Sequence, residues 1–266
     1  MPCFRFLLTG TFFLLLVGSS NAQIPEPGDF GSYMEASYPS DEGTLLYRIM
    51  FPINFDATQK YPLVLFLHGA GERGNDNQKQ LVHGSRLFQD SSTRYPAIVV
   101  FPQCPAEDYW ANVDVDVIDG NRRFTFMADG PATRPLAQVM ELVDKLIDQP
   151  YTDPARLYVT GLSMGGMGTW ELLWRMPGKL AAAAPICGGG NPRAAGEMTE
   201  VPIWAFHGVK DDVVRPHFTM RMIKAVQRAG GTAKVTFFPK ANHNSWDPAF
   251  ATPDYLSWMF SNRKSN

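Results

Sequence analysis

The first feature of chemical interest is a serine between two glycines. Gly161-Leu162-Ser163-Met164-Gly165 fits the pattern G-x-S-x-G, directly after an apolar run that predicts a strand and directly before a predicted helix. A sharp turn between strand and helix holds the serine hydroxyl clear of the backbone, and the glycines leave room where the two elements crowd together. The helix N-terminus adds N–H groups that can stabilise a developing oxyanion. The motif therefore predicts Ser163 as the nucleophile of an acyl transfer.

A serine hydroxyl is a weak nucleophile and needs a general base. The chain has five histidines, and in folds that carry this turn the acid and the base follow the serine in the order Ser, Asp, His. His68 and His83 precede Ser163 and do not suit that order. His243 follows the last predicted strand, so its loop returns to the sheet edge where Ser163 emerges. We predict His243 as the base and a structural role for His207.

The base needs a carboxylate to orient it. Asp211 and Asp212 both lie just after the predicted strand at residues 202–206. Their positions in the sequence do not separate them. From the residues alone, the acid is one of these two neighbours.

An oxyanion hole needs two backbone donors. One is the N–H of the residue after the nucleophile, Met164, and the other is expected from the loop after the first core strand. That loop is His68-Gly69-Ala70-Gly71, in which we favour Ala70, with Gly71 as the alternative. We expect His68 to brace the loop by hydrogen bonding.

Three further side chains lie in segments that could face a substrate cleft: Glu72, Trp110 and Trp246. Aromatic walls would suit an aryl acyl group, so we predict these as substrate contacts. The alternative is that both tryptophans pack the loops and that Glu72 forms an ion pair with Arg73.

Short apolar runs alternate with helical stretches, and these elements must position the residues above. Runs apolar on both faces are typical of a covered parallel sheet, and the alternation predicts a doubly wound α/β sheet with helices on both faces. The expected strands are 33–38, 45–51, 62–67, 97–101, 156–160, 181–186, 202–206 and 234–238, and the expected helices are 135–148, 164–175, 217–228 and 248–260. Segments 69–95 and 103–132 show little periodicity and are expected to be long functional loops.

Composition and the N-terminus limit the remaining choices. The net charge of −2 does not favour nucleic-acid binding. Residues 1–22 have the pattern of a signal peptide with cleavage after Ala22, an uncleaved anchor being the alternative. We therefore expect a secreted or periplasmic protein with no membrane contact after cleavage. It would have a loose leader at 23–32 and one catalytic domain at 33–266. Export would permit a disulfide between Cys104 and Cys187, which the sequence leaves open.

Taken together, these motifs resemble a known family. The chain is similar to bacterial α/β-hydrolase esterases related to dienelactone hydrolases, feruloyl esterases and polyhydroxybutyrate depolymerases, and most of all to the secreted phospholipase/carboxylesterase group. The matching stretches are Leu67-His68-Gly69-Ala70-Gly71-Glu72-Arg73-Gly74, Pro102-Gln103-Cys104-Pro105 with Trp110, Gly161-Leu162-Ser163-Met164-Gly165-Gly166, His207-Gly208-x-x-Asp211-x-Val213-Val214 and His243-Asn244-Ser245-Trp246.

The resemblance implies an α/β-hydrolase fold and hydrolysis of carboxylic esters through an acyl-enzyme. It assigns the acid to Asp211 and an oxyanion donor to Ala70, and it implies no metal or organic cofactor. The expected substrates are feruloyl or acetyl esters on plant polysaccharides, or small aryl and acyl esters. The alternatives are a polyester depolymerase and a serine peptidase of the prolyl-oligopeptidase type. The oligomeric state is left open.

Overall fold

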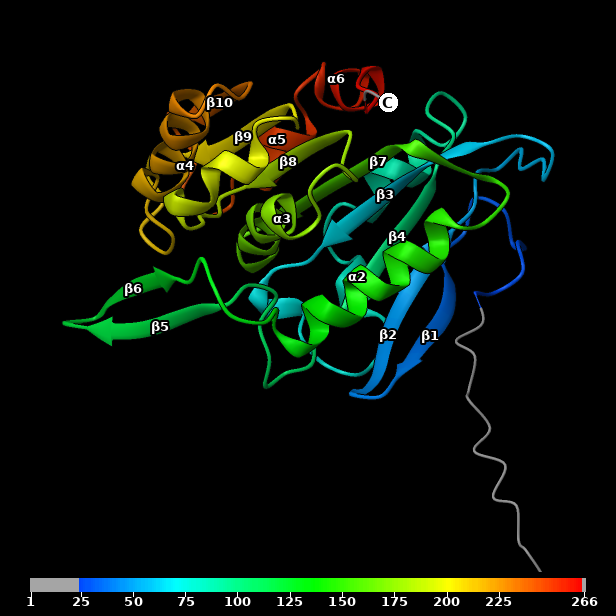
Figure 1. Ribbon diagram of the computed structural model, residues 1–266, viewed down its shortest axis with the longest axis horizontal. Coiled ribbons are helices and arrows are strands. Elements are labelled where there is room, and N and C mark those ends of the chain that lie inside the picture. The colour runs from blue at the N-terminus through cyan, green and yellow to red at the C-terminus, as the bar shows by residue number, and fades with distance from the viewer. Residues whose placement is uncertain (1–23, 265–266) are drawn as a thin grey trace, which may run out of the picture.

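A twisted eight-stranded sheet forms the centre of the molecule, as the computed structural model of residues 24–264 shows (Figure 1). Its strands are β1 (Met34–Ser40), β2 (Gly43–Met50), β3 (Tyr61–Leu67), β4 (Ile98–Gln103), β7 (Thr152–Leu162), β8 (Ala182–Ile186), β9 (Ile203–Gly208) and β10 (Ala233–Phe238). Their order across the sheet is β1-β2-β4-β3-β7-β8-β9-β10. The pairs β1·β2 and β2·β4 are antiparallel, whereas the pairs β3·β4, β3·β7, β7·β8, β8·β9 and β9·β10 are parallel.

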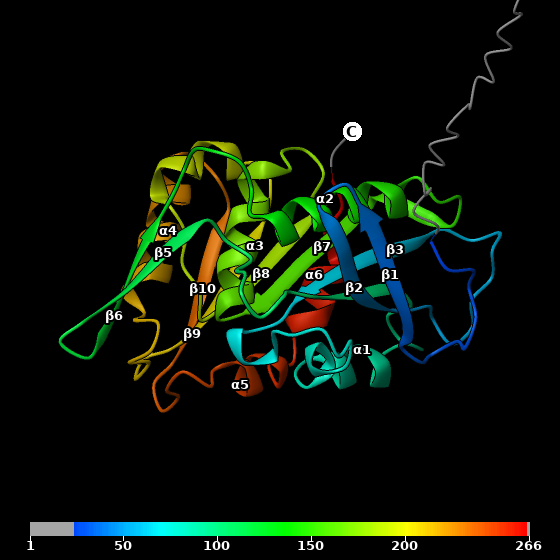
Figure 2. The same cartoon turned by 90° about the horizontal axis from the view of Figure 1, so that it is seen from below.

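Helices cover both faces of this sheet (Figure 2). One layer holds α2 (Arg134–Ile147), α3 (Met164–Arg175) and α4 (His217–Arg228). The opposite layer holds α1 (Ser85–Asp90), α5 (Trp246–Phe250) and α6 (Tyr255–Ser261). Short 3-10 helices η1 (Ala70–Glu72), η2 (Lys79–Leu81) and η3 (Pro192–Met198) lie in the connections. The predicted doubly wound, mostly parallel α/β fold is confirmed.

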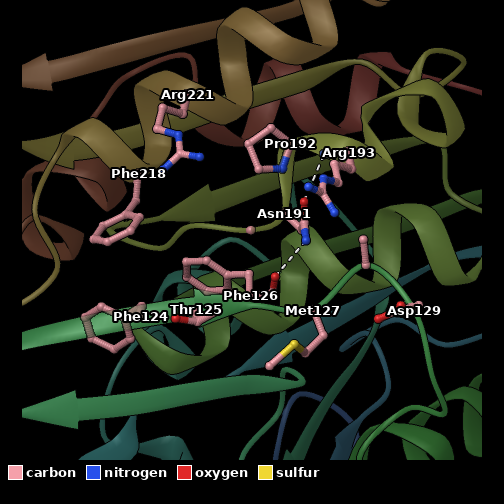
Figure 3. Close-up of a pocket in the computed structure, with 12 residues that line it drawn as sticks. Phe124, Thr125, Phe126, Met127, Asp129, Asn191, Pro192, Arg193, Phe218 and Arg221 are labelled. Atoms are coloured by element: carbon pink, nitrogen blue, oxygen red, sulfur yellow. Dashed lines mark hydrogen bonds between the residues drawn. The ribbon is translucent and has the colours of Figure 1, made fainter.

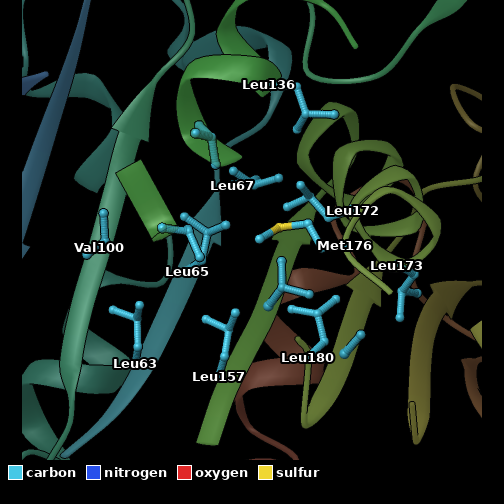
Figure 4. Packing of buried hydrophobic residues seen from close by; sticks show 14 of the residues in the cluster. Leu63, Leu65, Leu67, Val100, Leu136, Leu157, Leu172, Leu173, Met176 and Leu180 are labelled. Atoms are coloured by element: carbon cyan, nitrogen blue, oxygen red, sulfur yellow. The ribbon is translucent and has the colours of Figure 1, made fainter. Parts of the chain in front are cut away.

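Two buried clusters, one on each face of the sheet, hold these layers together. All seven residues of β3 are buried, as expected for a central strand covered by helices on both sides. Figure 4 shows the cluster beneath α3, where Leu65 and Leu157 of the sheet face Leu172 of α3 and Met176, which follows the helix. Alternate residues of the same strands, such as Phe66, enter the second cluster beneath α1, α5 and α6.

The end of the chain differs from its predicted form. Residues 248–260 were expected to form one helix, but α5 ends at Phe250 and α6 begins at Tyr255. Pro253 lies between them, and proline disfavours the helical conformation of the residue before it. Two short helices therefore replace the predicted long one.

The largest correction concerns the segment at 103–132, which was expected to be an irregular loop. It contains a two-stranded sheet of its own, β5 (Val113–Ile118) and β6 (Asn121–Phe126). Asp119 and Gly120 join the two strands with positive φ angles of 52° and 74°, which is the backbone of a type I′ hairpin turn. The alternation Val113-Asp114-Val115-Asp116-Val117 and the Asp-Gly turn are signals that could have predicted this hairpin.

The predicted signal peptide, residues 1–22, lies outside the described residues. Of the expected leader, residues 24–32 form no helix or strand, yet Ile24 is buried in the core and the ring of Phe30 stacks on Phe55 at 5.5 Å. The described part of the leader is thus packed against the domain. Within residues 24–264, no helix is long and apolar enough to cross a membrane.

Candidate active site

Ser163 lies on a strained turn between β7 and α3. Its φ of 53° falls in the left-handed region, which non-glycine residues rarely occupy. A Cβ on Gly161 would lie 2.6 Å from the carbonyl oxygen of Leu67, and one on Gly165 would collide with the same oxygen. Both glycines are therefore required by the close approach of β3. The Ser163 N–H donates to the Ile186 carbonyl over 2.9 Å, which fixes the turn against β8.

A hydrogen-bonded chain links this serine to a histidine and an aspartate from distant parts of the sequence. His243 Nε2 lies 2.9 Å from Ser163 Oγ, and His243 Nδ1 lies 2.8 Å from Asp211 Oδ2. Asp211 follows β9, and His243 follows β10. The Asp211 side chain is fully buried, whereas that of His243 is 21% exposed. The arrangement lets His243 accept the Ser163 proton while the carboxylate orients the ring.

Four donors surround the Asp211 carboxylate. Oδ1 accepts the N–H groups of Val213 and Val214, each over 2.9 Å, and Oδ2 faces His243 and His207. Burial opposes ionisation, but the hydrogen bonds from His207, His243 and the backbone prevail and hold the pKa of Asp211 well below its usual range. The adjacent carboxylate that the sequence left as an alternative, Asp212, is exposed.

His207 supports the carboxylate from the interior side. Its ring is fully buried, and Nε2 lies 3.1 Å from Asp211 Oδ2 and 2.7 Å from the Val214 carbonyl oxygen. Because both neighbours accept hydrogen bonds, Nε2 carries a proton and donates to them. Nδ1 lies 2.7 Å from the Thr219 hydroxyl on α4. His207 thus contacts the acid rather than the serine, in keeping with its expected structural role.

The two predicted oxyanion residues each begin a helix after a core strand, Ala70 after β3 and Met164 after β7. Ala70 is the first residue of η1 and Met164 the first of α3. The loop before Ala70 is braced by His68, whose Nε2 accepts from Cys104 N–H over 2.9 Å and whose Nδ1 donates to the Gly69 carbonyl over 2.6 Å. Burial lowers the pKa of His68 to about 4, so the ring is neutral in this tautomer at neutral pH.

Trp110 does not face a cleft, contrary to the prediction. Its side chain has no exposed surface, its Nε1 donates to the His68 carbonyl over 3.1 Å, and a Cβ on Gly168 would lie 2.7 Å from its own Cβ. The indole fills the space beneath the loop that carries Ala70. We therefore assign Trp110 a packing role and withdraw it as a substrate contact.

Glu72 and Trp246 lie closer to the reacting groups. The Trp246 ring meets the His243 ring edge to face, with centroids 5.7 Å apart, and lies 5.1 Å from the ring of His83. His83 Nε2 in turn lies 3.8 Å from a carboxylate oxygen of Glu72. The Glu72 carboxylate therefore faces His83, whereas Arg73 donates to the Ala70 carbonyl over 3.1 Å. His83 thus links the segments that carry Glu72 and Trp246, a contact that the sequence does not predict.

The two cysteines of the described chain are free and buried. Cys104 follows β4 and Cys187 follows β8, and two other strands separate β4 from β8 in the sheet. Three inter-strand spacings amount to about 14 Å, too far for a disulfide. The bridge that the sequence left open is therefore excluded for this conformation.

Sequence reasoning missed the position of Cys187 beside the reacting groups. Its sulfur, a carboxylate oxygen of Asp211 and a ring nitrogen of His243 lie within 4.8 Å of one another. These are metal-ligand types, but Asp211 Oδ2 and His243 Nδ1 are hydrogen-bonded to each other, and burial raises the pKa of Cys187 to about 12. Because the acid and the base engage each other and the thiol keeps its proton, the trio is poorly suited to holding a cation.

Comparison with known proteins agrees with the geometry of the fold. The sequence profile of the dienelactone hydrolase family matches residues 116–254, just over half of the chain. The chain belongs to the dienelactone hydrolase family. The matched region of this family member includes Ser163, Asp211 and His243.

Two curated relatives and one solved structure are similar to this chain over different lengths of sequence. A bifunctional acetylxylan esterase/xylanase of Neocallimastix patriciarum is 30% identical over 153 residues, 58% of this chain and 20% of that protein. Poly(3-hydroxyalkanoate) depolymerase C of Paucimonas lemoignei is 28% identical over 131 residues, 48% of this chain and 28% of that protein. The crystal structure of a thermostable esterase is 32% identical, covers 87% of this chain and 63% of that one, and superposes with a TM-score of 0.77. The chain thus spans less than a third of either curated relative.

Proposed function

We propose that this member of the dienelactone hydrolase family is a secreted serine carboxylesterase. The observation that carries the proposal is the unbroken chain of hydrogen bonds from Ser163 Oγ through His243 to Asp211. A nucleophile, a base and an orienting acid in hydrogen-bond contact are the parts that acyl transfer needs. The proposed substrates are acyl esters of plant polysaccharides or small aryl and acyl esters, and similarity to an acetylxylan esterase supports the former.

In the proposed mechanism, His243 Nε2 takes the proton of Ser163 Oγ as this oxygen attacks the ester carbonyl. The tetrahedral oxyanion would be stabilised by the N–H groups of Met164 and Ala70. His243 then returns the proton to the leaving alcohol, and the acyl group remains on Ser163. Water, activated by His243, hydrolyses this acyl-enzyme and regenerates the serine. Asp211 remains ionised throughout and stabilises the imidazolium that forms twice per cycle.

The proposal is tested by activity and by covalent labelling of the same serine. Purified protein is incubated with p-nitrophenyl esters, methyl ferulate, acetylated xylan and a prolyl-peptide anilide, and separately with a fluorophosphonate. We expect cleavage of one or more esters and labelling that the Ser163→Ala variant loses. Cleavage of the anilide alone would favour the peptidase alternative, and inactivity without labelling would contradict the enzymatic proposal.

A polyester depolymerase is a second candidate because one relative carries that activity in its name. The reaction would be the same attack by Ser163 on a carboxylic ester, and only the acyl chain would differ. Release of soluble hydroxyacids from a polyhydroxyalkanoate film, with no cleavage of acetylated xylan, would favour this candidate.

Export is part of the proposal and is supported by the sequence of residues 1–22. We expect the full chain, expressed in a bacterial host, to reach the periplasm or medium with Gln23 as its first residue. N-terminal sequencing checks the cleavage site, and a protein that keeps residues 1–22 would contradict it.

A further inference from the structure

One pocket among the described residues is large enough for a ligand and does not include the candidate catalytic residues. It has a volume of about 730 Å³ and opens between the β5–β6 hairpin, the chain after β8 and the first turns of α4 (Figure 3). Ser163, Asp211 and His243 are not among its lining residues. A volume in this range suits a small ligand or a ring of a larger one.

Aromatic rings form one wall of this pocket. The rings of Phe126 on β6 and Phe218 on α4 have centroids 5.7 Å apart at an angle of 76°. A Cβ on Gly189 would lie 2.7 Å from Phe218 Cβ and 3.2 Å from the Phe126 ring, so the absence of a side chain at Gly189 lets both rings pack closely over the backbone. Both phenylalanines are partly exposed and offer apolar surface to a ligand.

Positive charge also lines the pocket, from Arg221 on α4 and from Arg193 in η3. Among the described lining residues, Arg193 and Arg221 are the cations and Asp129 is the acid, so cations are in excess. Partial burial and then the charges of Arg221 and Arg215 lower the pKa of His217, in keeping with a positive potential at this end of α4. The N-terminus of α4 adds to that potential through its helix dipole. The pocket therefore favours an anionic group.

The pocket lies within reach of Ser163 along the chain that follows β8. The Ile186 carbonyl accepts the Ser163 N–H, and Gly190, four residues later, lines the pocket. Four residues span at most about 14 Å when extended. A short oligosaccharide bound in the pocket could thus present an ester on a neighbouring sugar to Ser163.

We propose that this pocket is a subsite for an acidic sugar of the substrate. Arg193 and Arg221 would hold the sugar carboxylate, and the apolar face of the ring would lie on Phe126 and Phe218. The exposed Thr125 hydroxyl and the Asp129 carboxylate can hydrogen-bond sugar hydroxyls, which a simple aromatic acid such as benzoate lacks. This inference rests on the proposed esterase function and gives it a substrate class, the acyl esters of uronate-bearing polysaccharides.

The kinetic test compares acetylated xylo-oligosaccharides with and without a glucuronate side group. At low salt we expect kcat/KM to favour the charged substrate by about tenfold or more, because charge-assisted contacts to guanidinium groups are the strong ones. The Arg193→Gln/Arg221→Gln variant should reduce this ratio to about one, chiefly by lowering kcat/KM for the charged substrate. Arg228→Gln, an exposed arginine in the last turn of the same helix, is the matched control and should keep the ratio. Raising the salt concentration should lower the ratio in the wild type.

A binding measurement separates failure of the subsite from failure of the esterase proposal. A deacetylated, glucuronate-bearing xylo-oligosaccharide is titrated calorimetrically into the wild type and the double variant. Binding to the wild type that the double variant loses supports the subsite, even if the wild type cleaves neither ester. Absence of cleavage would count against the esterase proposal and not against the subsite. Equal binding by both proteins, or a kinetic ratio that survives in the double variant, would overturn the subsite. Competition by benzoate as strong as that by glucuronate would overturn the assignment to a sugar.

Discussion

Replacing Asp211 with asparagine should remove nearly all turnover, and the structure shows why the amide cannot substitute for the carboxylate. Oδ1 of Asp211 accepts two backbone N–H groups, from Val213 and Val214. An asparagine must keep its carbonyl oxygen there, since an NH₂ group would leave both donors unpaired. Its NH₂ group then faces His243 Nδ1 and the proton-bearing Nε2 of His207.

That orientation forces His243 into the wrong tautomer. Nδ1 would have to accept from the amide, so the ring proton would move to Nε2, the atom 2.9 Å from Ser163 Oγ. A protonated Nε2 cannot take the serine proton. An aspartate-to-asparagine change of this kind in a serine protease lowers kcat about 10⁴-fold, equivalent to about 5 kcal/mol of transition-state stabilisation, and we expect a loss of that order here.

The assay is the kcat of ester hydrolysis at neutral pH for Asp211→Asn and for Asp212→Asn. Asp212 is exposed, so its variant should remain within about twofold of the wild type. Thermal melts and circular dichroism show whether Asp211→Asn is folded, because the unfavourable contact with His207 will also cost some stability. A folded Asp211→Asn protein within tenfold of wild-type kcat, or an equal loss in Asp212→Asn, would refute the reasoning.

Three further predictions concern the surroundings of the reacting groups. Gly165→Ala should lower the melting temperature by about 5 °C or more, or prevent folding, because its Cβ would collide with the Leu67 carbonyl oxygen. Burial lowers the pKa of His68 from 6.5 to about 4, so between these pH values the folded state binds fewer protons than the unfolded state. About 3 kcal/mol of folding stability, fully present above pH 6.5, should therefore be lost as the pH falls to 4. Urea unfolding of His68→Gln should show a shallower dependence on pH. Trp246→Ala should lower kcat/KM up to about tenfold, because the edge-to-face contact that orients the His243 ring is worth roughly 1 kcal/mol, and Trp246→Phe should restore most of the loss.

The residues at the ends of the core strands could be predicted from the sequence because parallel strands end at one edge of the sheet. Short apolar runs marked β3, β7, β9 and β10, and the polar residues that follow them include Ser163, Asp211 and His243. The rules of strand order and crossover hand then bring those residues together. The motif G-x-S-x-G adds a local steric reason, since the close approach of β3 to the turn leaves no room for a Cβ at Gly161 or Gly165.

Properties that depend on contacts between distant loops could not be predicted in the same way. Trp110 was expected in a cleft wall, but its indole is buried, donates to the carbonyl of His68 and packs where Gly168 has no side chain. Glu72 was predicted as a substrate contact, with an ion pair to Arg73 as the alternative, but its carboxylate lies 3.8 Å from His83 of another segment. In both cases the contacting residues are not neighbours in the sequence, so no local sequence pattern predicts which group each residue contacts. The β5–β6 hairpin is different, because its alternating valines and aspartates and its Asp-Gly turn are local signals that could have predicted it.

The proposed reaction and the proposed sugar binding depend on different parts of the chain, the strand ends and the β5–β6 hairpin with its neighbours. The candidate catalytic groups are fixed at the ends of the core strands, where Ser163 and Asp211 also bond to the backbone. The proposed sugar subsite is formed by β6, α4 and η3, whose lining arginines are exposed. The buried ring of Phe124 packs with Met167, one turn along α3 from Ser163, and with Val214, so the hairpin is held in register with the catalytic edge. Substitutions in the subsite could therefore change which ester is bound while the geometry of the proposed reaction is kept.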